Sequence, residues 1–348
     1  MRLLLIRTSA LGDIVHCLPV LTALRRHWPD AHVGWVVERS MASLLAGHPD
    51  IDELIPVDFR PWRRRLFSPA TLKEILETRR VLRRFRADAV LELMGNHKGG
   101  LVAWASGCKV RIGLDRRSRR EPSSALWINR PVPPQGVHAV DRALSVLTGL
   151  GLSAEPAGFA GERLLADPPS SAAALLAEAP EQLALVVPGT AWGNKTYPAE
   201  RWGAVARGLA ERVGLTTWVA TGPGEEVLGE AVAAASGGVA RSLGLVDLPT
   251  FAALCRHARL VLGGDTGPTH LAHALGAPVL EIMGPTDPQS HGPYAHPENT
   301  IAVRLPCSFC HRRFDGAKAC LLAIPPEAVV ERSLRLLETP SGTGLGSR

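Results

Sequence analysis

Short apolar runs alternate with amphipathic helical patterns along most of the chain. The first run is "LLLI" at 3–6, and the apolar positions between 14 and 24 then recur every three to four residues, as they do in a helix. Helical patterns also occupy 199–212 and 248–257. Further strand-like runs lie at 32–38, 87–94, 109–114, 183–189, 216–222 and 259–265, and another opens 282–288. This alternation predicts βαβ units with parallel strands.

The pattern is repeated in two halves. A chain of 348 residues exceeds what one ordinary core supports, so we expect about two domains. A segment rich in Pro, Gly and Ala separates the halves, and we expect a ligand site in a cleft between two α/β domains. The predicted division is 1–155, a linker at 156–170, 171–325, a final amphipathic helix at 326–338 and a frayed tail at 339–348.

The turn after the first apolar run, "RTSALGD" at 7–13, carries a carboxylate. Asp13 follows the 3–6 strand and precedes the first helical pattern, and ligands bind at the carboxyl ends of strands in open α/β sheets. Asp13 is equally suited to cap the helix, because aspartate favours the first turn and the positive end of the helix dipole. These residues alone leave both roles open.

Basic residues are concentrated in the first half. Residues 1–150 contain 24 Lys and Arg against 14 Asp and Glu, whereas the remainder contains 15 against 19. The arginine run at 79–86 fits a solvated helix face. The runs at 60–65 and 111–120 indicate loops that meet an anionic partner, such as a phosphate, a nucleic acid or a membrane. Aromatic residues make up only 5% of the chain, so stacking on single-stranded nucleic acid is poorly supported.

The composition, 46% hydrophobic and 21% charged, is that of a globular protein. No apolar stretch approaches the roughly 18 residues that span a bilayer, and the apolar run between Arg2 and Arg7 is too short for a signal peptide. Half of the six cysteines are scattered, unlike a disulfide framework. We therefore expect a cytoplasmic protein.

Two turns of the second half carry groups suited to phosphate and ribose. In "PGTAWGNKTYP" at 188–198, Thr190 and Lys195 offer a hydroxyl and a cation to an anion. The glycine spacing departs from a P-loop, which argues against an ATPase or a P-loop phosphotransferase. In "TGPGEEVL" at 221–228, Glu225 is placed to reach a ribose.

The most informative stretch is "GGDTGPTHLAHALG" at 263–276. A strand runs into a glycine-rich turn, and a helix follows from about Pro268, with Asp265 or Thr266 as its cap. The N–H groups of that first turn can hold a diphosphate without a metal. His270 and His273 lie three apart, and without a third ligand they make a weak metal site.

Three other motifs indicate little chemistry. The GxGxxA pattern at 149–154 ends a helix and does not follow a strand, which argues against a Rossmann dehydrogenase. The D-x-D at 50–52 reads as an ordinary surface connection. Cys307, Cys310 and Cys320 have an irregular spacing for a zinc site, and reduced thiols fit them better, although zinc is retained as an alternative.

The motifs "RTSALGDIVHCLPVL", "GTAWGNKTYPAERW", "GDTGPTHLAHALGAP" and "GPTDP", in this order, resemble glycosyltransferase family 9, the lipopolysaccharide heptosyltransferases. The similarity runs from residue 1 to about 338, and "FRPWRRRLFS", "RREPSSALWINR" and "HAVDRAL" are most similar to the heptosyltransferase I branch. The resemblance implies a GT-B fold, in which the N-terminal of two Rossmann-like domains binds the acceptor and the C-terminal one binds the donor. It also implies transfer of heptose from ADP-L-glycero-D-manno-heptose, with inversion, to the Kdo of the lipid A inner core, with no cofactor.

Site residues follow from matching positions. Asp13 corresponds to the general base that takes the proton from the acceptor hydroxyl. The donor residues implied are Thr190 and Lys195 for the phosphates, Glu225 for the ribose, Asp265 for the heptose hydroxyls, Thr266 and Gly267 for the diphosphate, and His270 beside them. The acceptor residues implied are Arg60, Arg63, Arg64, Lys98 and Arg120. We expect the same basic surface to contact the cytoplasmic face of the inner membrane, and we expect no nucleic-acid partner.

Two departures and two alternatives accompany this resemblance. Met94 and Asn96 stand where the branch reads more like a Gln-Gly-Leu turn, and the cysteine segment is nearer to heptosyltransferase II. The alternatives are a heptosyltransferase II or III, or a family member with another nucleotide sugar, and a non-catalytic protein that binds lipid or polysaccharide. A scaffold has no use for Asp13, Lys195 and the 265–270 turn together, which argues against the second.

Overall fold

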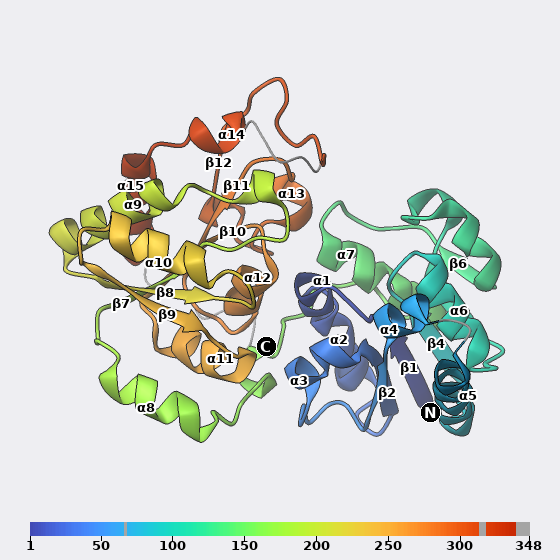
Figure 1. The fold of residues 1–348 in the computed structure, drawn as a ribbon. Helices are drawn as coiled ribbons and strands as arrows, with labels where there is room; N and C mark the ends of the chain where they lie inside the picture. The colour runs from blue at the N-terminus through green and yellow to red at the C-terminus, as the bar shows by residue number, and fades with distance from the viewer. Residues whose placement is uncertain (66–67, 313–317, 339–348) are drawn as a thin grey trace. The chain divides into compact units, whose positions relative to one another are not determined.

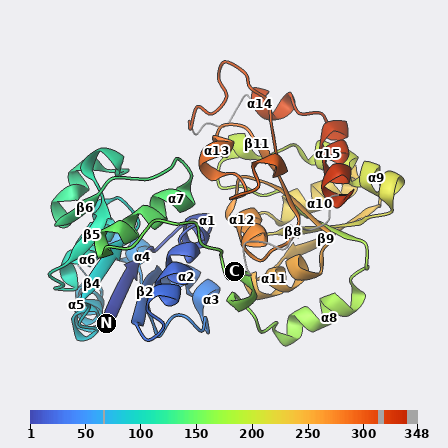
Figure 2. The same cartoon turned by 180° about the vertical axis from the view of Figure 1, so that it is seen from behind.

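The computed structural model describes residues 1–65, 68–312 and 318–338, and the chain divides into two compact units, Met1–Leu165 and Ala166–Arg348. Each unit has a central sheet with helices on both faces (Figures 1 and 2). The predicted tail, 339–348, and the middle of the cysteine segment lie outside the described residues. The binding of one substrate by each unit, with a cleft between them, stays a prediction.

In the first unit, the described residues form one sheet of six parallel strands in the order β3-β2-β1-β4-β5-β6. Leu4 of β1 lies between Gly34 of β2 and Val90 of β4. Residues 3–6 are buried on both faces of the sheet, as an uninterrupted apolar run predicts. The strands are β1 (Arg2–Ile6), β2 (His32–Glu38), β3 (Glu53–Val57), β4 (Ala89–Glu92), β5 (Arg111–Leu114) and β6 (Arg130–Val132).

Helices of the first unit pack on this sheet around a core that includes Ile6, Val36 and Phe85. Gly34 is required for close packing, because a β-carbon there would lie 2.5 Å from the Phe85 ring. The helices are α1 (Leu11–Val15), α2 (Leu18–His27), α3 (Ala42–Leu45), α4 (Phe59–Arg64), α5 (Pro69–Arg84), α6 (His97–Ala105) and α7 (Ala139–Leu144), with short 3₁₀ turns that include Arg116–Ser118 and Pro122–Trp127.

The second unit repeats the design. Its described residues form six parallel strands in the order β12-β11-β10-β7-β8-β9. Val261 of β10 lies between Val279 of β11 and Leu185 of β7. The strands are β7 (Leu183–Val187), β8 (Thr216–Thr221), β9 (Ala240–Leu245), β10 (Leu260–Gly264), β11 (Val279–Met283) and β12 (Thr300–Ala302).

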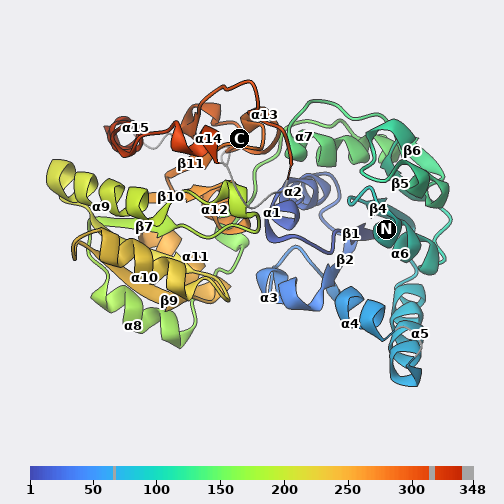
Figure 3. The ribbon, with the colours of Figure 1, turned by 45° about the horizontal axis from the view of Figure 1, so that its top comes forward.

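The helices of the second unit form two groups. α9 lies beside α10 and α15, and α11 lies beside α8 and α12 (Figure 3). Tyr197, just before α9, and Trp202, in its first turn, are buried and stack edge to face at 5.2 Å. The helices are α8 (Ser170–Glu178), α9 (Ala199–Val213), α10 (Glu226–Ala235), α11 (Leu248–His257), α12 (Gly267–Ala274), α13 (Pro288–His291), α14 (Ala319–Leu322) and α15 (Pro326–Glu338).

The structure confirms the predicted central strands and the helices at 199–212, 248–257 and 326–338. Two predictions were wrong. The run at 60–65 is the helix α4 and not a loop, because Trp62 is buried in the core and anchors a helical turn. Asp50, predicted on the surface, is buried and paired with Arg163 at 2.8 Å. No helix in the described part of the chain has both the length and the apolar character needed to cross a membrane.

Candidate active site

Asp13 lies on α1, directly beyond the carboxyl end of the central strand β1. Its Oδ2 accepts a hydrogen bond from the backbone N–H of Ala10, the residue that precedes the helix, at 3.1 Å. The side chain is nevertheless 40% exposed. Asp13 therefore takes part in the helix N-terminus and still presents its carboxylate at the edge of the sheet, so both roles predicted for it are compatible.

The largely buried side chain of Arg7 holds this carboxylate in place. Its Nη2 lies 2.7 Å from Asp13 Oδ2, and its Nη1 donates to the carbonyl of Leu93. Burial alone would lower the pKa of Arg7, but Asp13 outweighs that effect and raises it above its ordinary value. The contact is a charge-assisted hydrogen bond from the guanidinium to the carboxylate. Arg7 thus orients Asp13, a function that sequence reasoning missed.

The cations predicted to bind an acceptor are all exposed, and two of them, Lys98 and Arg120, lie at or beside the start of α6. Trp62 is fixed by the core and by a hydrogen bond from its Nε1 to Glu74 at 2.9 Å, so Arg63 and Arg64 on the same helix project into solvent. The Nζ of Lys98, on α6, lies 5.7 Å from the ring centroid of Phe59, beside Arg60. These contacts bring Lys98 next to α4.

Arg120 belongs to the same end of the sheet, because the residue after it, Glu121, donates its N–H to the carbonyl of Gly95 at 3.0 Å. A β-carbon on Gly95, which has a φ of +64°, would lie 3.3 Å from the nitrogen of Arg120. The turn before α6 and the 115–124 segment are therefore packed backbone to backbone. Arg120 is held beside that turn and remains exposed.

One arginine of the 111–120 run, which was predicted to form a surface for an anionic partner, belongs instead to a buried ion pair. Arg119 and Glu92 are both fully buried, with Nη2 and Oε2 2.5 Å apart. Glu92 Oε1 also accepts the backbone N–H groups of Met94 and Gly95, at 3.0 Å each. The pair therefore fixes the turn that leads into α6. In the sequence, an acidic residue inside the apolar run "AVLEL" is the signal that marks it.

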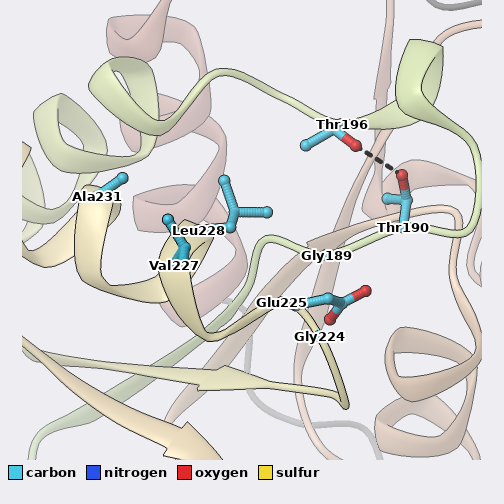
Figure 4. Close-up of a pocket in the computed structure, with 8 residues that line it drawn as sticks. All are labelled: Gly189, Thr190, Thr196, Gly224, Glu225, Val227, Leu228 and Ala231. Atoms are coloured by element: carbon cyan, nitrogen blue, oxygen red, sulfur yellow. Dashed lines mark hydrogen bonds between the residues drawn. The ribbon is translucent and has the colours of Figure 1, made fainter.

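The second unit has a pocket of about 440 Å³ at the carboxyl ends of β7 and β8 (Figure 4). Thr190 and Thr196 share a hydrogen bond of 2.8 Å on one side, and Glu225 projects beneath them. Glu225 Oε2 accepts the N–H of Gly222 at 3.0 Å. Val227, Leu228 and Ala231 provide an apolar side. A carboxylate, hydroxyls and an apolar wall together suit a nucleoside.

Gly189 is essential to this geometry. A β-carbon added there would lie 1.9 Å from Glu225 Oε2, so only glycine allows the carboxylate to lie against the backbone of the turn. The strand β7 and the turn at 188–198 thereby position Glu225 from one side, and the start of α10 positions it from the other.

Lys195, Asp265, His270 and Glu281 form a buried chain of alternating charges. Lys195 Nζ lies 2.5 Å from Asp265 Oδ2 and 4.2 Å from the ring centroid of Trp192. His270 Nε2 lies 3.0 Å from Asp265 Oδ1, and its Nδ1 lies 3.2 Å from Glu281 Oε1. Lys195, Asp265 and His270 were predicted from the sequence. Glu281 was missed, although it too is a lone acid in an apolar run, "VLEIM".

These contacts shift the pKa values of the buried groups. Burial alone would lower the pKa of His270, but Glu281 and Asp265 outweigh it and raise the pKa to about 10. Burial alone would raise the pKa of Asp265, but His270 and Lys195 hold it well below its usual range. Burial raises the pKa of Glu281, and His270 offsets part of that rise. At neutral pH, His270 is therefore an imidazolium between two acids.

The turn at 264–267 leads into α12, which begins at Gly267. Thr266 occupies the capping position, as predicted, but its side chain makes no capping bond, and Asp265 is engaged by Lys195 and His270. The first-turn N–H groups of a helix have no partners within the helix. The arrangement thus combines a helix N-terminus with an ammonium group, which suits a diphosphate.

Replacing Glu281 by glutamine should lower the free energy of unfolding by about 2 kcal/mol at pH 7, because His270 would lose one of its two buried acids. The folded pKa of His270 is raised from 6.5 to about 10. The stabilisation is therefore fully present below pH 6.5 and is lost as the pH rises through 10. Denaturant unfolding of both proteins from pH 6 to 10 measures this difference, and parallel pH profiles would contradict the network.

The cysteine segment shows no metal site in the part that the structure describes, where no group of three or more His, Cys, Asp or Glu side chains is arranged to hold an ion. Cys320 is buried, Cys307 is exposed, and both carry free thiols, as does Cys310. Residues 313–317, between them, lie outside the described residues. Among the described residues around these three thiols, none supports the zinc alternative.

Comparisons with known proteins agree with the site's chemistry. The model of glycosyltransferase family 9 (heptosyltransferase) matches residues 75–320, more than half of the chain. The lipopolysaccharide heptosyltransferase 1 of Pseudomonas aeruginosa is 32% identical over 90% of this chain and 87% of its own length. The protein of the same name from Escherichia coli K12 is 30% identical over 88% of this chain and 94% of its own.

Solved structures extend the comparison to the fold. The E. coli heptosyltransferase WaaC with ADP has a TM-score of 0.80 and 27% identity, and the match covers 97% of this chain and 100% of that one. The same enzyme with ADP-2-deoxy-2-fluoro heptose has a TM-score of 0.77 and 28% identity, over 95% and 98%. This chain is an enzyme with the two-domain GT-B fold, and it belongs to glycosyltransferase family 9, the heptosyltransferases.

Proposed function

We propose that this glycosyltransferase transfers L-glycero-D-manno-heptose from its ADP donor to the Kdo of the lipopolysaccharide inner core, with inversion at the anomeric carbon. The observation that carries the proposal is the 32% identity over 90% of the chain to a lipopolysaccharide heptosyltransferase 1. The exposed Asp13 at a sheet edge in one unit and the nucleoside-sized pocket in the other are consistent with it.

The donor would be held by the second unit. Its ribose would meet Glu225, and its adenine would lie against the apolar wall of Val227, Leu228 and Ala231. Lys195 would face two anions, Asp265 and the diphosphate, while the N–H groups of Thr266 and Gly267 would receive the phosphate oxygens. Because His270 is held between Asp265 and Glu281, it would keep Asp265 oriented toward the heptose hydroxyls.

The acceptor would be held by the first unit. Arg60, Arg63, Arg64, Lys98 and Arg120 would bind the Kdo carboxylate and the lipid A phosphates. Asp13 would then take the proton from the attacking hydroxyl. The hydroxyl oxygen would form a bond to the anomeric carbon as the bond between that carbon and the β-phosphate oxygen breaks, and ADP would leave with the electron pair. Attack opposite the leaving group inverts the configuration.

ADP release tests this proposal. The full-length protein would be incubated with ADP-heptose, or in parallel with other nucleotide sugars, and with Kdo–lipid A that does or does not carry a first heptose. Acceptor-dependent ADP release that is faster without the first heptose is the expected result. Faster release with the heptosylated acceptor would assign the protein to heptosyltransferase II or III. Release from another nucleotide sugar only would move it to a different donor class.

Replacing both Arg63 and Arg64 by alanine should raise the acceptor KM about tenfold and reduce its dependence on salt, because two charge-assisted contacts are lost. The ADP-heptose KM should change little, since the proposed donor residues belong to the other unit. The double variant Arg80→Ala, Arg84→Ala, which removes two exposed arginines of α5, is the matched control. An equal rise in both KM values would mean that the substrates are assigned to the wrong units.

Transfer should continue in excess EDTA, because Lys195 and the α12 N-terminus are proposed to meet the charge of the departing ADP. The rate would be measured before and after chelation, with Mg²⁺ restored in a parallel sample. A complete and reversible loss of activity would overturn the prediction of a cofactor-free reaction.

A further inference from the structure

One face of the first unit exposes large apolar side chains that the proposed reaction does not use. Leu101 and Trp104 on α6 are 46% and 52% exposed, and Leu126 on the neighbouring 3₁₀ turn is 65% exposed. Lys98, Leu101 and Trp104 are spaced by three residues, so they follow one stripe along the helix. A stripe that a globular protein would normally bury is open to solvent here.

Trp127 packs the 3₁₀ turn that carries Leu126 against the helix that carries Leu101 and Trp104. Its ring packs against α6 at Gly100, where a β-carbon would lie 2.4 Å from it, and its Nε1 donates to His97 Nδ1 at 3.1 Å. The Trp127 and Trp104 rings are 5.9 Å apart. Leu126 precedes Trp127 on the same 3₁₀ turn and is exposed. The packing fixes the turn on the helix and leaves its apolar side chains outward.

Basic side chains lie at both ends of this stripe. Lys98 occupies the end that faces α4 and its arginines. Arg83 and Arg86 line a hollow of about 390 Å³ with Ser106, Gly107 and Cys108, directly after the other end of α6. The two ends are about 13 Å apart, from nine residues at 1.5 Å each. We name Leu101, Trp104 and Leu126, with Lys98, Arg83 and Arg86, the α6 face.

We propose that the α6 face docks on an anionic lipid surface, with its leucines and Trp104 in the headgroup boundary and its three cations at the lipid phosphates. Charge complementarity favours lipid over a protein partner: the face presents three cations around three apolar groups, and the half of the chain that carries it has ten more basic than acidic residues. A tryptophan and leucines flanked by Lys and Arg are the composition of interfacial membrane helices.

The docking also agrees with the proposed function. Only this agreement rests on the proposed function, and the docking itself does not. Lys98 is both an end of the α6 face and a proposed acceptor ligand, so the sugar of a membrane-bound acceptor would emerge beside the site that receives it. The docking differs from the arginine contacts of α4, because it includes apolar insertion, which salt does not screen.

Vesicle sedimentation tests the proposal with the full chain and vesicles that contain no acceptor. One set is phosphatidylcholine alone, and the other contains phosphatidylglycerol at one third of the lipid. The variant Leu101→Ser, Leu126→Ser should bind the anionic vesicles at least about tenfold more weakly than the wild type. The control Val213→Ser, Leu322→Ser changes side chains of the other unit that are 42% and 47% exposed, and it should bind as the wild type does.

Two further measurements separate the possible outcomes. Brominated acyl chains should quench the tryptophan fluorescence of the wild type more than that of the variant Trp104→Phe. The double variant Arg83→Gln, Arg86→Gln should bind more weakly to anionic vesicles only. Transfer to a deacylated, water-soluble acceptor should be unchanged by Leu101→Ser, Leu126→Ser. Equal vesicle binding by this variant and the wild type would overturn the proposal, as would self-association of the wild type that this variant abolishes. If no heptose is transferred to any acceptor, the proposed function fails and the vesicle results still decide the docking.

Discussion

Replacing Asp13 by alanine should lower turnover by about a hundredfold or more, the scale at which loss of a general base is felt. Without the carboxylate, nothing on α1 would accept the proton of the attacking hydroxyl. The donor KM should remain nearly unchanged. The fold should also be retained, because the side chain is 40% exposed and lies on a helix of five residues. Single-turnover rates and donor titration measure the two effects separately.

The control is Asp30→Ala, which removes an exposed aspartate of the same unit and should leave the rate unchanged. Asp13→Asn sharpens the result, because it keeps the size of the side chain and removes its basicity. If Asp13→Ala keeps more than about a tenth of the wild-type rate, Asp13 is not the base.

Replacing Arg119 by alanine should lower the free energy of unfolding by about 3–5 kcal/mol, because it leaves the fully buried Glu92 without its guanidinium. Burial already raises the pKa of Glu92, and loss of Arg119 would raise it further. The variant's loss of unfolding free energy is therefore largest at pH values where Glu92 is ionised. The loss becomes smaller as falling pH protonates Glu92. Denaturant unfolding at pH 5 and pH 8 should therefore show the larger difference at pH 8.

Its neighbour in sequence, Arg120, provides the matched control. Arg120→Ala removes an exposed guanidinium, so stability should change by no more than about 0.5 kcal/mol while the acceptor KM rises. A loss below about 1 kcal/mol for Arg119→Ala would contradict the buried ion pair. Equal losses for the two variants would show that Arg119 is a surface residue.

The central strands of both sheets could be predicted, because strands covered on both faces read as long apolar runs, such as residues 3–6 and 183–187. The four strands that sequence reasoning did not identify are β3, β6, β9 and β12, which are the edges of the two described sheets. These edge strands are partly exposed, β6 and β12 have only three residues each, and β3 contains Pro56. Their polar positions hide the strand pattern.

The candidate site residues also divide into those that could be predicted from the sequence and those that could not. Asp13 and Glu225 could be found because each follows a strand at the edge where ligands bind. Arg7, Arg119 and Glu281 were missed because a sequence does not distinguish a charge that faces solvent from one that faces another charge in the core. Only the fold brings Glu281 to His270 and Arg119 to Glu92. Substrate and membrane contacts remain proposals.

Analysis of the reaction product tests the central claim most directly. Full-length protein would be incubated with ADP-heptose and Kdo–lipid A, and the acceptor would be examined by mass spectrometry and by NMR of the new anomeric centre. We expect one added heptose on the Kdo, with a configuration opposite to that of the donor, and about a hundredth of that product or less from Asp13→Ala in the same time. Retained configuration, or ADP release without a heptosylated acceptor, would contradict inverting transfer by Asp13.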